Sequence, residues 1–241
     1  MDLQKLYSFV RKAVYDYQMI EEGDKIAVGI SGGKDSLALL YALAGLKNFY
    51  PVPFTLHAIT VDPGFERMGL EQMNFEPVAE MCKSLEVPYT VVKTQIGEIL
   101  KAHDTGKPVC SLCARLRRGT LKDEMLALGC NKLAYGHHKD DVIETALLSL
   151  LYGGNFYCFA PVTRQDSFSV IRPMIYVPEG MIRGFAKRYE LPVVYNPCPY
   201  DNNSRRSDIK EMLRKLTAVN KQYKNNIFHA ITLTKEWKDL S

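Results

Sequence analysis

The chain has 241 residues and a formal net charge of +4 at pH 7. Hydrophobic residues make up 46% and charged residues 24% of it, which is typical of a soluble globular protein. No apolar run approaches the roughly 18–20 residues that a membrane-spanning helix needs, and the first residues lack the apolar core of a secretory signal. We therefore expect a cytoplasmic protein without a membrane anchor, in which the six cysteines serve metal binding or catalysis rather than disulfides.

The positive charge is concentrated at the C-terminal end of the chain. Residues 201–241 contain nine Lys and Arg against five Asp and Glu, whereas the rest of the chain contains 22 of each. A basic segment predicts a polyanionic partner such as RNA, although a solvated helix face has the same composition. We predict three parts: an N-terminal helix over residues 1–22, a main domain over 23–200 and a basic helical tail over 201–241.

The first predicted elements are an amphipathic helix over residues 3–20 and a buried strand that ends in a glycine-rich turn. Ile26, Val28 and Ile30 form the apolar run of a central parallel strand, and a helical run begins at Leu37. Between them stands the sequence Ser31-Gly32-Gly33-Lys34-Asp35-Ser36. Glycines allow backbone N–H groups to approach an anion closely, and the following helix points its positive end at the loop. The segment predicts a phosphate-binding loop, with an ordinary glycine-rich turn as the alternative.

This loop is neither a Walker loop nor a dinucleotide fingerprint, because Asp35 follows Lys34 and the glycine spacing differs. It resembles the PP-loop of the N-type ATP pyrophosphatases, which split ATP into AMP and pyrophosphate. The resemblance implies that residues 31–36 bind the pyrophosphate part of ATP and that Lys34 and Asp35 act in catalysis.

Three further elements are predicted next: a strand over residues 54–61, a helix over 71–85 and a strand over 88–92. In an open α/β sheet, the carboxyl ends of the strands carry the ligand. The PP-loop resemblance therefore implies that Asp62 and Phe65, after the second strand, contact the ribose or base of ATP. A plain turn is the alternative.

A C-x-x-C motif, Cys110 and Cys113, lies at a predicted loop-to-helix junction. Two thiolates at this spacing can hold one metal ion or cluster, whereas a redox pair and a chance spacing are the alternatives. Three arginines are expected to lower the thiol pKa values: Arg115, Arg117 and Arg118. Cys198 offers a third thiol in a loop after a predicted last strand over residues 193–195, and Cys158 remains a candidate fourth ligand.

A second acidic signal follows the strand that runs into Gly136. Asp140 and Asp141 stand where the next helix begins, and paired carboxylates facing a phosphate loop are suited to Mg²⁺. Capping of the helix N-terminus is the alternative. Gly136 and His138, in the loop before this helix, are expected to contact ATP.

Taken in order, SGGKDS, CSLCARLRRG, GHHKDDVIET, YGG, IRPMIYV and NPC resemble the tRNA 2-thiocytidine synthetase family over roughly residues 20–215. The resemblance implies an α/β fold: an open parallel, Rossmann-like sheet with helices on both faces and a small helical C-terminal tail. It also implies ATP, Mg²⁺ and a 4Fe-4S cluster, with Cys110, Cys113 and Cys198 as cluster ligands. One feature departs from the family, because many members carry a second C-x-x-C where Pro-Tyr-Asp follows Cys198 here.

The tail contains an amphipathic helix over residues 204–216, whose apolar face is expected to pack inward. Cations share the opposite face at a spacing of four and are expected to meet RNA phosphates: Arg206, Lys210 and Arg214, with Arg205 beside them and Arg115, Arg117 and Arg118 in the main domain. Tyr223, Phe228 and Trp237 are expected to dock the tail rather than to stack on bases.

The resembling family adds sulfur to C2 of a cytidine in the tRNA anticodon loop. We therefore expect an ATP-dependent sulfurtransferase that adenylates the C2 oxygen and replaces it with sulfur from the cluster. A persulfide on a cysteine is the alternative carrier, the sulfur donor is a cysteine desulfurase or free sulfide, and the resemblance implies a homodimer.

Two other function classes stay open. One is a PP-loop ligase that forms an amide or amidine, or thiolates another base or a small molecule, with a structural zinc on the same cysteines. The other is a nucleotide-dependent RNA-binding module without catalysis.

Overall fold

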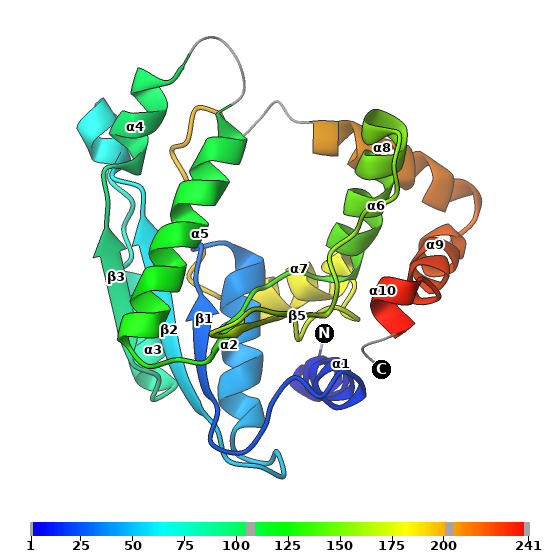
Figure 1. Cartoon of the computed structure of the whole chain (residues 1–241), viewed down its shortest axis with the longest axis horizontal. Helices are drawn as coiled ribbons and strands as arrows, with labels where there is room; N and C mark the ends of the chain where they lie inside the picture. Colours follow the sequence, from blue (N-terminus) through cyan, green and yellow to red (C-terminus); the bar gives the residue numbers. More distant parts are fainter. Residues whose placement is uncertain (1, 105–108, 201–204, 239–241) are drawn as a thin grey trace.

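The computed structural model describes residues 2–104, 109–200 and 205–238. Within these residues, one sheet of six strands has the order β3-β2-β1-β4-β6-β5 (Figure 1). Its strands are β1 Lys25–Gly29, β2 Thr55–Asp62, β3 Tyr89–Lys93, β4 Lys132–Ala134, β5 Val162–Arg164 and β6 Ser169–Ile171. All neighbouring strands are parallel except β5, which runs antiparallel to β6.

Helices connect the strands and complete the chain. They are α1 Leu3–Asp16, α2 Lys34–Leu46, α3 Glu76–Ser84, α4 Ile96–Ala102, α5 Cys110–Ala127, α6 Lys139–Gly153, α7 Glu179–Arg188, α8 Arg205–Val219, α9 Tyr223–Thr232 and α10 Lys235–Lys238, with a short 3-10 helix over Phe65–Met68. In the described part of the chain, no helix is long and apolar enough to cross a membrane.

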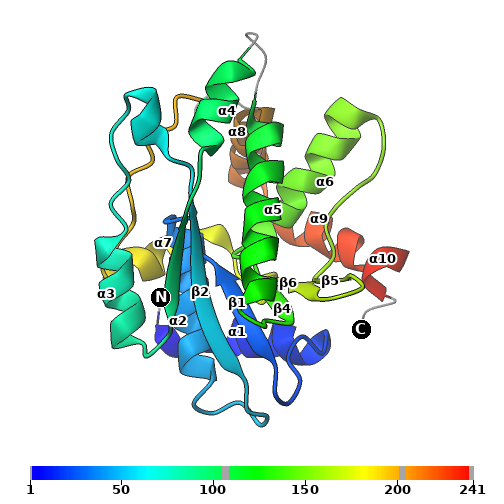
Figure 2. The ribbon, with the colours of Figure 1, turned by 60° about the vertical axis from the view of Figure 1, so that its left-hand side comes forward.

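Two apolar clusters cover the two faces of the sheet, so the predicted fold class is confirmed. On one face, α2 and α7 pack through buried side chains such as Leu39 and Phe185. On the other face, α4 and α5 pack through Leu100 and Met125, and Figure 2 shows α5 lying across the sheet. Parallel strands buried on both faces need such helical layers.

The order of the strands determines where in the sheet a ligand site is expected. β1 lies between β2 and β4, with Val28 opposite Ala58 on one side and Ala134 on the other. The order of the strands reverses at β1, and in open α/β sheets ligands bind at the carboxyl edge beside such a switch point. The loops that follow β1 and β4 therefore meet at one edge.

Some predicted boundaries were wrong for local reasons. The first helix ends at Asp16 rather than at residue 20, and Gln18 adopts a positive φ of 46°. The helix predicted from residue 71 begins at Glu76, whose N–H donates to Asn74 Oδ1. Residues 193–195 do not form a strand, because the N–H of Val194 donates to the carbonyl of Gly32 at 2.9 Å instead of joining the sheet.

The tail docks on the rest of the molecule, as predicted for its aromatic residues. Ile209 and Leu213 of α8 are buried, and Trp237 is 1% exposed against Tyr17 and Phe228. The N-terminal helix and the tail thus share one apolar cluster with the sheet. The division into three parts stays a prediction, and residues 1, 201–204 and 239–241 of those parts lie outside the described residues.

Replacing Trp237 with Ala should lower the free energy of unfolding by about 3–5 kcal/mol, because it empties a buried aromatic site between α10 and the end of α1. Urea unfolding followed by circular dichroism measures the change, since Trp237 is the only tryptophan in the sequence. Tyr15→Ala, at a position 77% exposed, is the control and should change stability little. A loss below 1 kcal/mol would contradict the docked tail.

Candidate active site

The glycine-rich loop forms an anion cradle at the start of α2. Gly33 is the N-cap residue and offers no side-chain hydrogen bond, so the first N–H groups of α2 face the loop uncapped. Ser36 shapes the loop: its hydroxyl donates to the Gly33 carbonyl at 3.0 Å and accepts the Ser31 N–H at 3.1 Å. Gly32 has a φ of +81°, which side-chain-bearing residues rarely adopt.

Two other segments press against this loop at glycine positions. A Cβ atom on Gly136 would lie 2.9 Å from the carbonyl carbon of Asp35 and 3.0 Å from the nitrogen of Ser36. A Cβ atom on Gly32 would lie 2.9 Å from the Cβ of Val194. The loop after β4 and the segment around Val194 therefore contact the phosphate loop with almost no space between them.

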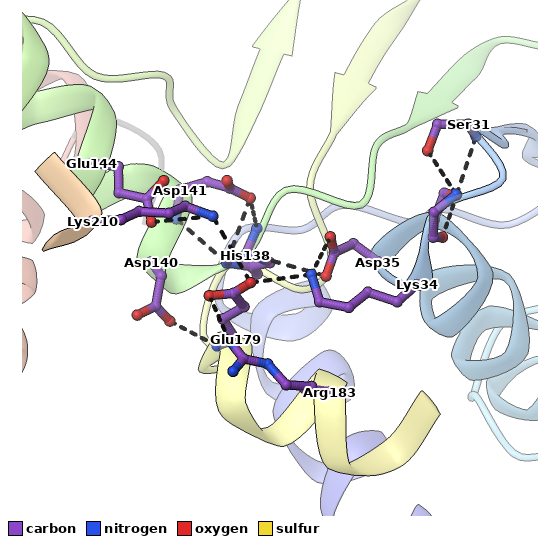
Figure 3. Close-up of polar contacts among 12 residues, drawn as sticks. Ser31, Lys34, Asp35, His138, Asp140, Asp141, Glu144, Glu179, Arg183 and Lys210 are labelled. Atoms are coloured by element: carbon purple, nitrogen blue, oxygen red, sulfur yellow. Dashed lines mark hydrogen bonds and ion pairs between the residues drawn. The ribbon is translucent and has the colours of Figure 1, made fainter. Parts of the chain in front are cut away.

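Lys34 points into a group of carboxylates. Its Nζ lies 2.9 Å from Asp35 Oδ2 and 3.1 Å from Glu179 Oε1 (Figure 3). Burial alone lowers the pKa of Lys34, but the hydrogen bonds and charges of the two carboxylates outweigh it and raise the pKa. The other oxygen of Asp35 is buried without a hydrogen bond, with His138 Nε2 at 3.7 Å.

The two predicted magnesium ligands differ in their surroundings. Asp141 forms a capping box with His138: its Oδ2 accepts the His138 N–H at 3.0 Å, while its own N–H donates to the His138 ring. Asp140 accepts the N–H of Glu179 and an ion pair from Lys224. Burial raises the pKa of Asp140, but these partners lower it on balance. Asp141 therefore caps the N-terminus of α6, as the alternative prediction stated. Asp140 instead connects α6 to α7 through Glu179 and to α9 through Lys224.

Two acidic residues of the site were missed in the sequence. Glu144 lies one turn after Asp140 on α6 and is 2% exposed, and burial raises its pKa to about 7. Its spacing from the acidic pair could have revealed it. Glu179 is the first residue of α7. The only signal for it in the sequence was its position after a proline at the start of a helix.

A cavity of about 1030 Å³ opens beside the phosphate loop. The predicted residues that line it are Ser31, Asp35, Ser36, Gly136, Asp141, Arg117 and Arg118. Asp62 is not among the lining residues: it is 5% exposed and accepts the N–H of Gly64 in a turn, and its contact with ATP stays a prediction. The cavity is large enough to hold a nucleotide-sized ligand.

The far wall of the cavity contains residues that no sequence motif had assigned to a ligand. Arg172 is buried, donates to the Ala160 carbonyl at 2.6 Å and lies over the ring of Phe159. His137 packs against the same ring at 4.7 Å between centroids. Burial, followed by the charge of Arg172, lowers the pKa of His137 to about 4, so its ring is neutral at pH 7.

Three cysteines lie close together at the start of α5. Cys110 and Cys113 are in its first turn, and the charges of Cys198 and Cys110 both raise the pKa of Cys113. Arg117 lowers this pKa, as expected of the arginines, but burial is the largest cause and raises it. Among the described residues, no three His, Cys, Asp or Glu side chains are gathered as metal ligands. The thiols of Cys110, Cys113 and Cys198 share one region and are the kind of donor that an iron–sulfur cluster takes, but they would have to approach one another more closely to hold one. Cys158 is buried in the cavity wall instead.

The cations predicted to bind RNA fall into two groups. Arg206 and Lys210 turn toward the carboxylates of α6 and α7, with Arg206 Nη1 3.2 Å from Asp141 Oδ1. The others lie on exposed or half-exposed parts of the molecule: Arg115, Arg117 and Arg118 on α5, and Arg205 and Arg214 on α8. The helical spacing in the sequence did not show which of these cations would face carboxylates and which would lie on the exposed surface.

Comparison with known proteins agrees with this geometry. A family model described as a PP-loop domain matches residues 4–217. The tRNA-cytidine(32) 2-sulfurtransferase of Alkalilimnicola ehrlichii is 39% identical over 95% of this chain and 73% of the relative. That of Geobacter metallireducens is 38% identical over 95% of the chain and 89% of the relative.

A solved structure is also similar to this chain. It is the U34-tRNA thiolase NcsA from Methanococcus maripaludis with its [4Fe-4S] cluster, which superposes with a TM-score of 0.75 at 26% identity, over 92% of this chain and 76% of that chain. Both the sequence relatives and the family model cover the phosphate loop, the cysteine motif and the acidic helix. The chain belongs to the PP-loop domain family and, within it, to the family of the tRNA-cytidine(32) 2-sulfurtransferases.

Proposed function

We propose that the chain is an ATP-dependent tRNA sulfurtransferase, which replaces the C2 oxygen of an anticodon-loop cytidine by sulfur. One juxtaposition carries this proposal: an uncapped phosphate loop, a nucleotide-sized cavity and three neighbouring thiols lie at one edge of the sheet. The substrate follows the name of the sequence relatives, in which the modified cytidine is residue 32.

The first step is adenylation of the base. The N–H groups at the start of α2, in a loop that the Ser36 hydroxyl orders, and Lys34 hold the pyrophosphate part of ATP. The C2 oxygen of cytidine attacks the α-phosphorus, the bond to the β-phosphate oxygen breaks, and pyrophosphate leaves. This converts a poor leaving group at C2 into AMP.

The second step is sulfur transfer. A sulfur nucleophile attacks C2, the C2–O bond breaks, and AMP leaves with the original oxygen. A 4Fe-4S cluster bound by Cys110, Cys113 and Cys198 would supply an iron without a protein ligand, at which sulfide can bind. A persulfide on one of these cysteines is the alternative carrier. Apolar side chains such as Ile59, Leu133 and Val170 line part of the cavity and disfavour water there, which would otherwise compete for the activated base.

Mg²⁺ is expected to enter with the phosphates of ATP, since it is commonly bound through one or two carboxylates and substrate oxygens. Asp35 and Asp141 fit this task best, because one oxygen of Asp35 is buried without a hydrogen bond and Asp141 lines the cavity. Asp140 is the weaker candidate, because it is not among the residues that line the cavity and its two oxygens accept the Glu179 N–H and the Lys224 ion pair.

The remaining partners follow from the same reaction. The arginines of α5, together with Arg205 and Arg214, supply positive charge for the RNA backbone. The base must leave the RNA stack to enter the cavity, which an anticodon loop permits. A cysteine desulfurase or free sulfide supplies the sulfur, the chain acts in the cytoplasm, and it assembles as a homodimer.

Replacing Lys34 with Ala should slow tRNA-dependent release of AMP by roughly 10²–10³-fold, because a charge that stabilises the departing pyrophosphate is lost. Radiolabelled ATP and thin-layer chromatography measure the rate. Lys47→Ala, at the exposed far end of the same helix, is the control and should retain full activity. A Lys34→Ala rate within threefold of the parent would argue against the PP-loop role.

Replacing Cys198 with Ser should abolish thiolation while adenylation of the tRNA continues. After anaerobic purification, the parent should contain about four irons per chain and the variant far fewer. Ser111→Ala, between the two other cysteines and exposed, should keep the metal. Parental thiolation by Cys198→Ser would refute both sulfur routes, and one zinc per parent chain without iron would favour the ligase alternative.

A further inference from the structure

Two cations of α8 face the phosphate loop from across the carboxylate group. Arg206 and Lys210 are one turn apart on the same side of the helix. Arg206 Nη1 lies 3.2 Å from Asp141 Oδ1, and Lys210 Nζ lies 3.9 Å from an oxygen of Glu144. The burial of Ile209 and Leu213 fixes the side of α8 that packs against the molecule, and thereby directs both cations to the acidic residues.

Glu179 links these cations to the phosphate loop. Its Oε1 atom is 3.1 Å from Lys34 Nζ and 3.9 Å from Lys210 Nζ. One carboxylate oxygen thus stands between the loop lysine and the α8 lysine, and Figure 3 shows both side chains directed at it. A negatively charged oxygen already occupies the point where the two positive groups converge.

The contacts of Lys210 are long and exchangeable. Both of its ion pairs measure 3.9 Å, and its side chain is 48% exposed. Arg206 is 40% exposed and holds Asp141 and Thr145 at 3.2 Å each. Weak, half-solvated ion pairs contribute little on their own, so a more highly charged anion can replace the carboxylates.

We propose that Arg206 and Lys210 form the second half of the pyrophosphate site and hold the β- and γ-phosphates of ATP on the side opposite the PP-loop. This assignment rests on the proposed use of ATP and deepens it. The PP-loop offers backbone N–H groups and a single lysine, whereas a triphosphate carries up to four negative charges. Two cations from α8 supply the charge that the loop lacks, and guanidinium suits the bidentate geometry of phosphate oxygens.

The position of these cations separates this role from general RNA binding. Arg214 and Lys215, further along the same helix, are 73% and 71% exposed and pair with Glu211 of their own helix. They face solvent, where an RNA backbone can reach them. Arg206 and Lys210 instead point toward the loop that holds the phosphates.

Calorimetric binding to the full chain, without tRNA, tests the proposal with two probes: magnesium pyrophosphate and AMP. Lys210→Ala is the main variant, because its loose contacts make misfolding improbable, and Arg206→Lys is the second. Lys210→Ala should weaken pyrophosphate binding roughly 10-fold or more, given the usual strength of charge-assisted contacts, and leave AMP binding unchanged. Arg206→Lys should weaken pyrophosphate binding less, because the positive charge remains while the two parallel N–H donors of the guanidinium group are lost. Arg214→Ala and Lys215→Ala are matched controls on the same helix.

The outcomes are distinct. Pyrophosphate affinity unchanged in Lys210→Ala and Arg206→Lys would overturn the assignment, and a loss of tRNA affinity in these variants, measured in a separate binding assay, would assign both residues to RNA binding instead. Equal weakening of AMP and pyrophosphate would also overturn it, since AMP lacks the two phosphates in question. Thiolation of tRNA by the parent protein, assayed in parallel, shows separately whether the proposed function stands.

Discussion

The site depends on the contact of three separate segments, which glycine residues allow to approach closely at the phosphate loop. Gly136 brings the loop after β4 against the backbone of Asp35 and Ser36, and Gly32 lets Val194 lie on the loop itself. Atoms at such distances leave no room for even a methyl group. The position of the acidic helix α6, and that of the segment that carries Cys198, are therefore set by the same few atoms that cradle the anion.

The charges around this contact are balanced within the protein before any ligand arrives. Lys34, Arg206 and Lys210 each face carboxylates of α2, α6 or α7. These pairs direct the cations toward the acidic residues, and the long pairs of Lys210 can be exchanged for an anion that enters. The buried Glu144, with a pKa of about 7, can also take up a proton and thereby reduce the local negative charge.

Much of the fold and part of the site could be predicted from sequence because their signals are local. The phosphate loop, the C-x-x-C motif at the start of α5 and the acidic start of α6 each depend on neighbouring residues. Residues 193–195 have high strand propensity, but propensity does not show whether a sheet edge is available. For α8, periodicity identified which residues share a face, but not that this face would meet Glu144 and Glu179. Glu179 itself is brought to Lys34 only by the tertiary fold.

The hydrogen bond from Val194 to Gly32 connects the phosphate loop directly to the segment that carries Cys198. Val194 lies against the phosphate loop through this bond, and Cys198 lies four residues further along the same segment. Coupling between two sites is thermodynamically reciprocal. Under the proposed function, any factor by which nucleotide binding changes the affinity of the thiols for their group is also the factor by which that group changes the affinity of the loop for phosphate.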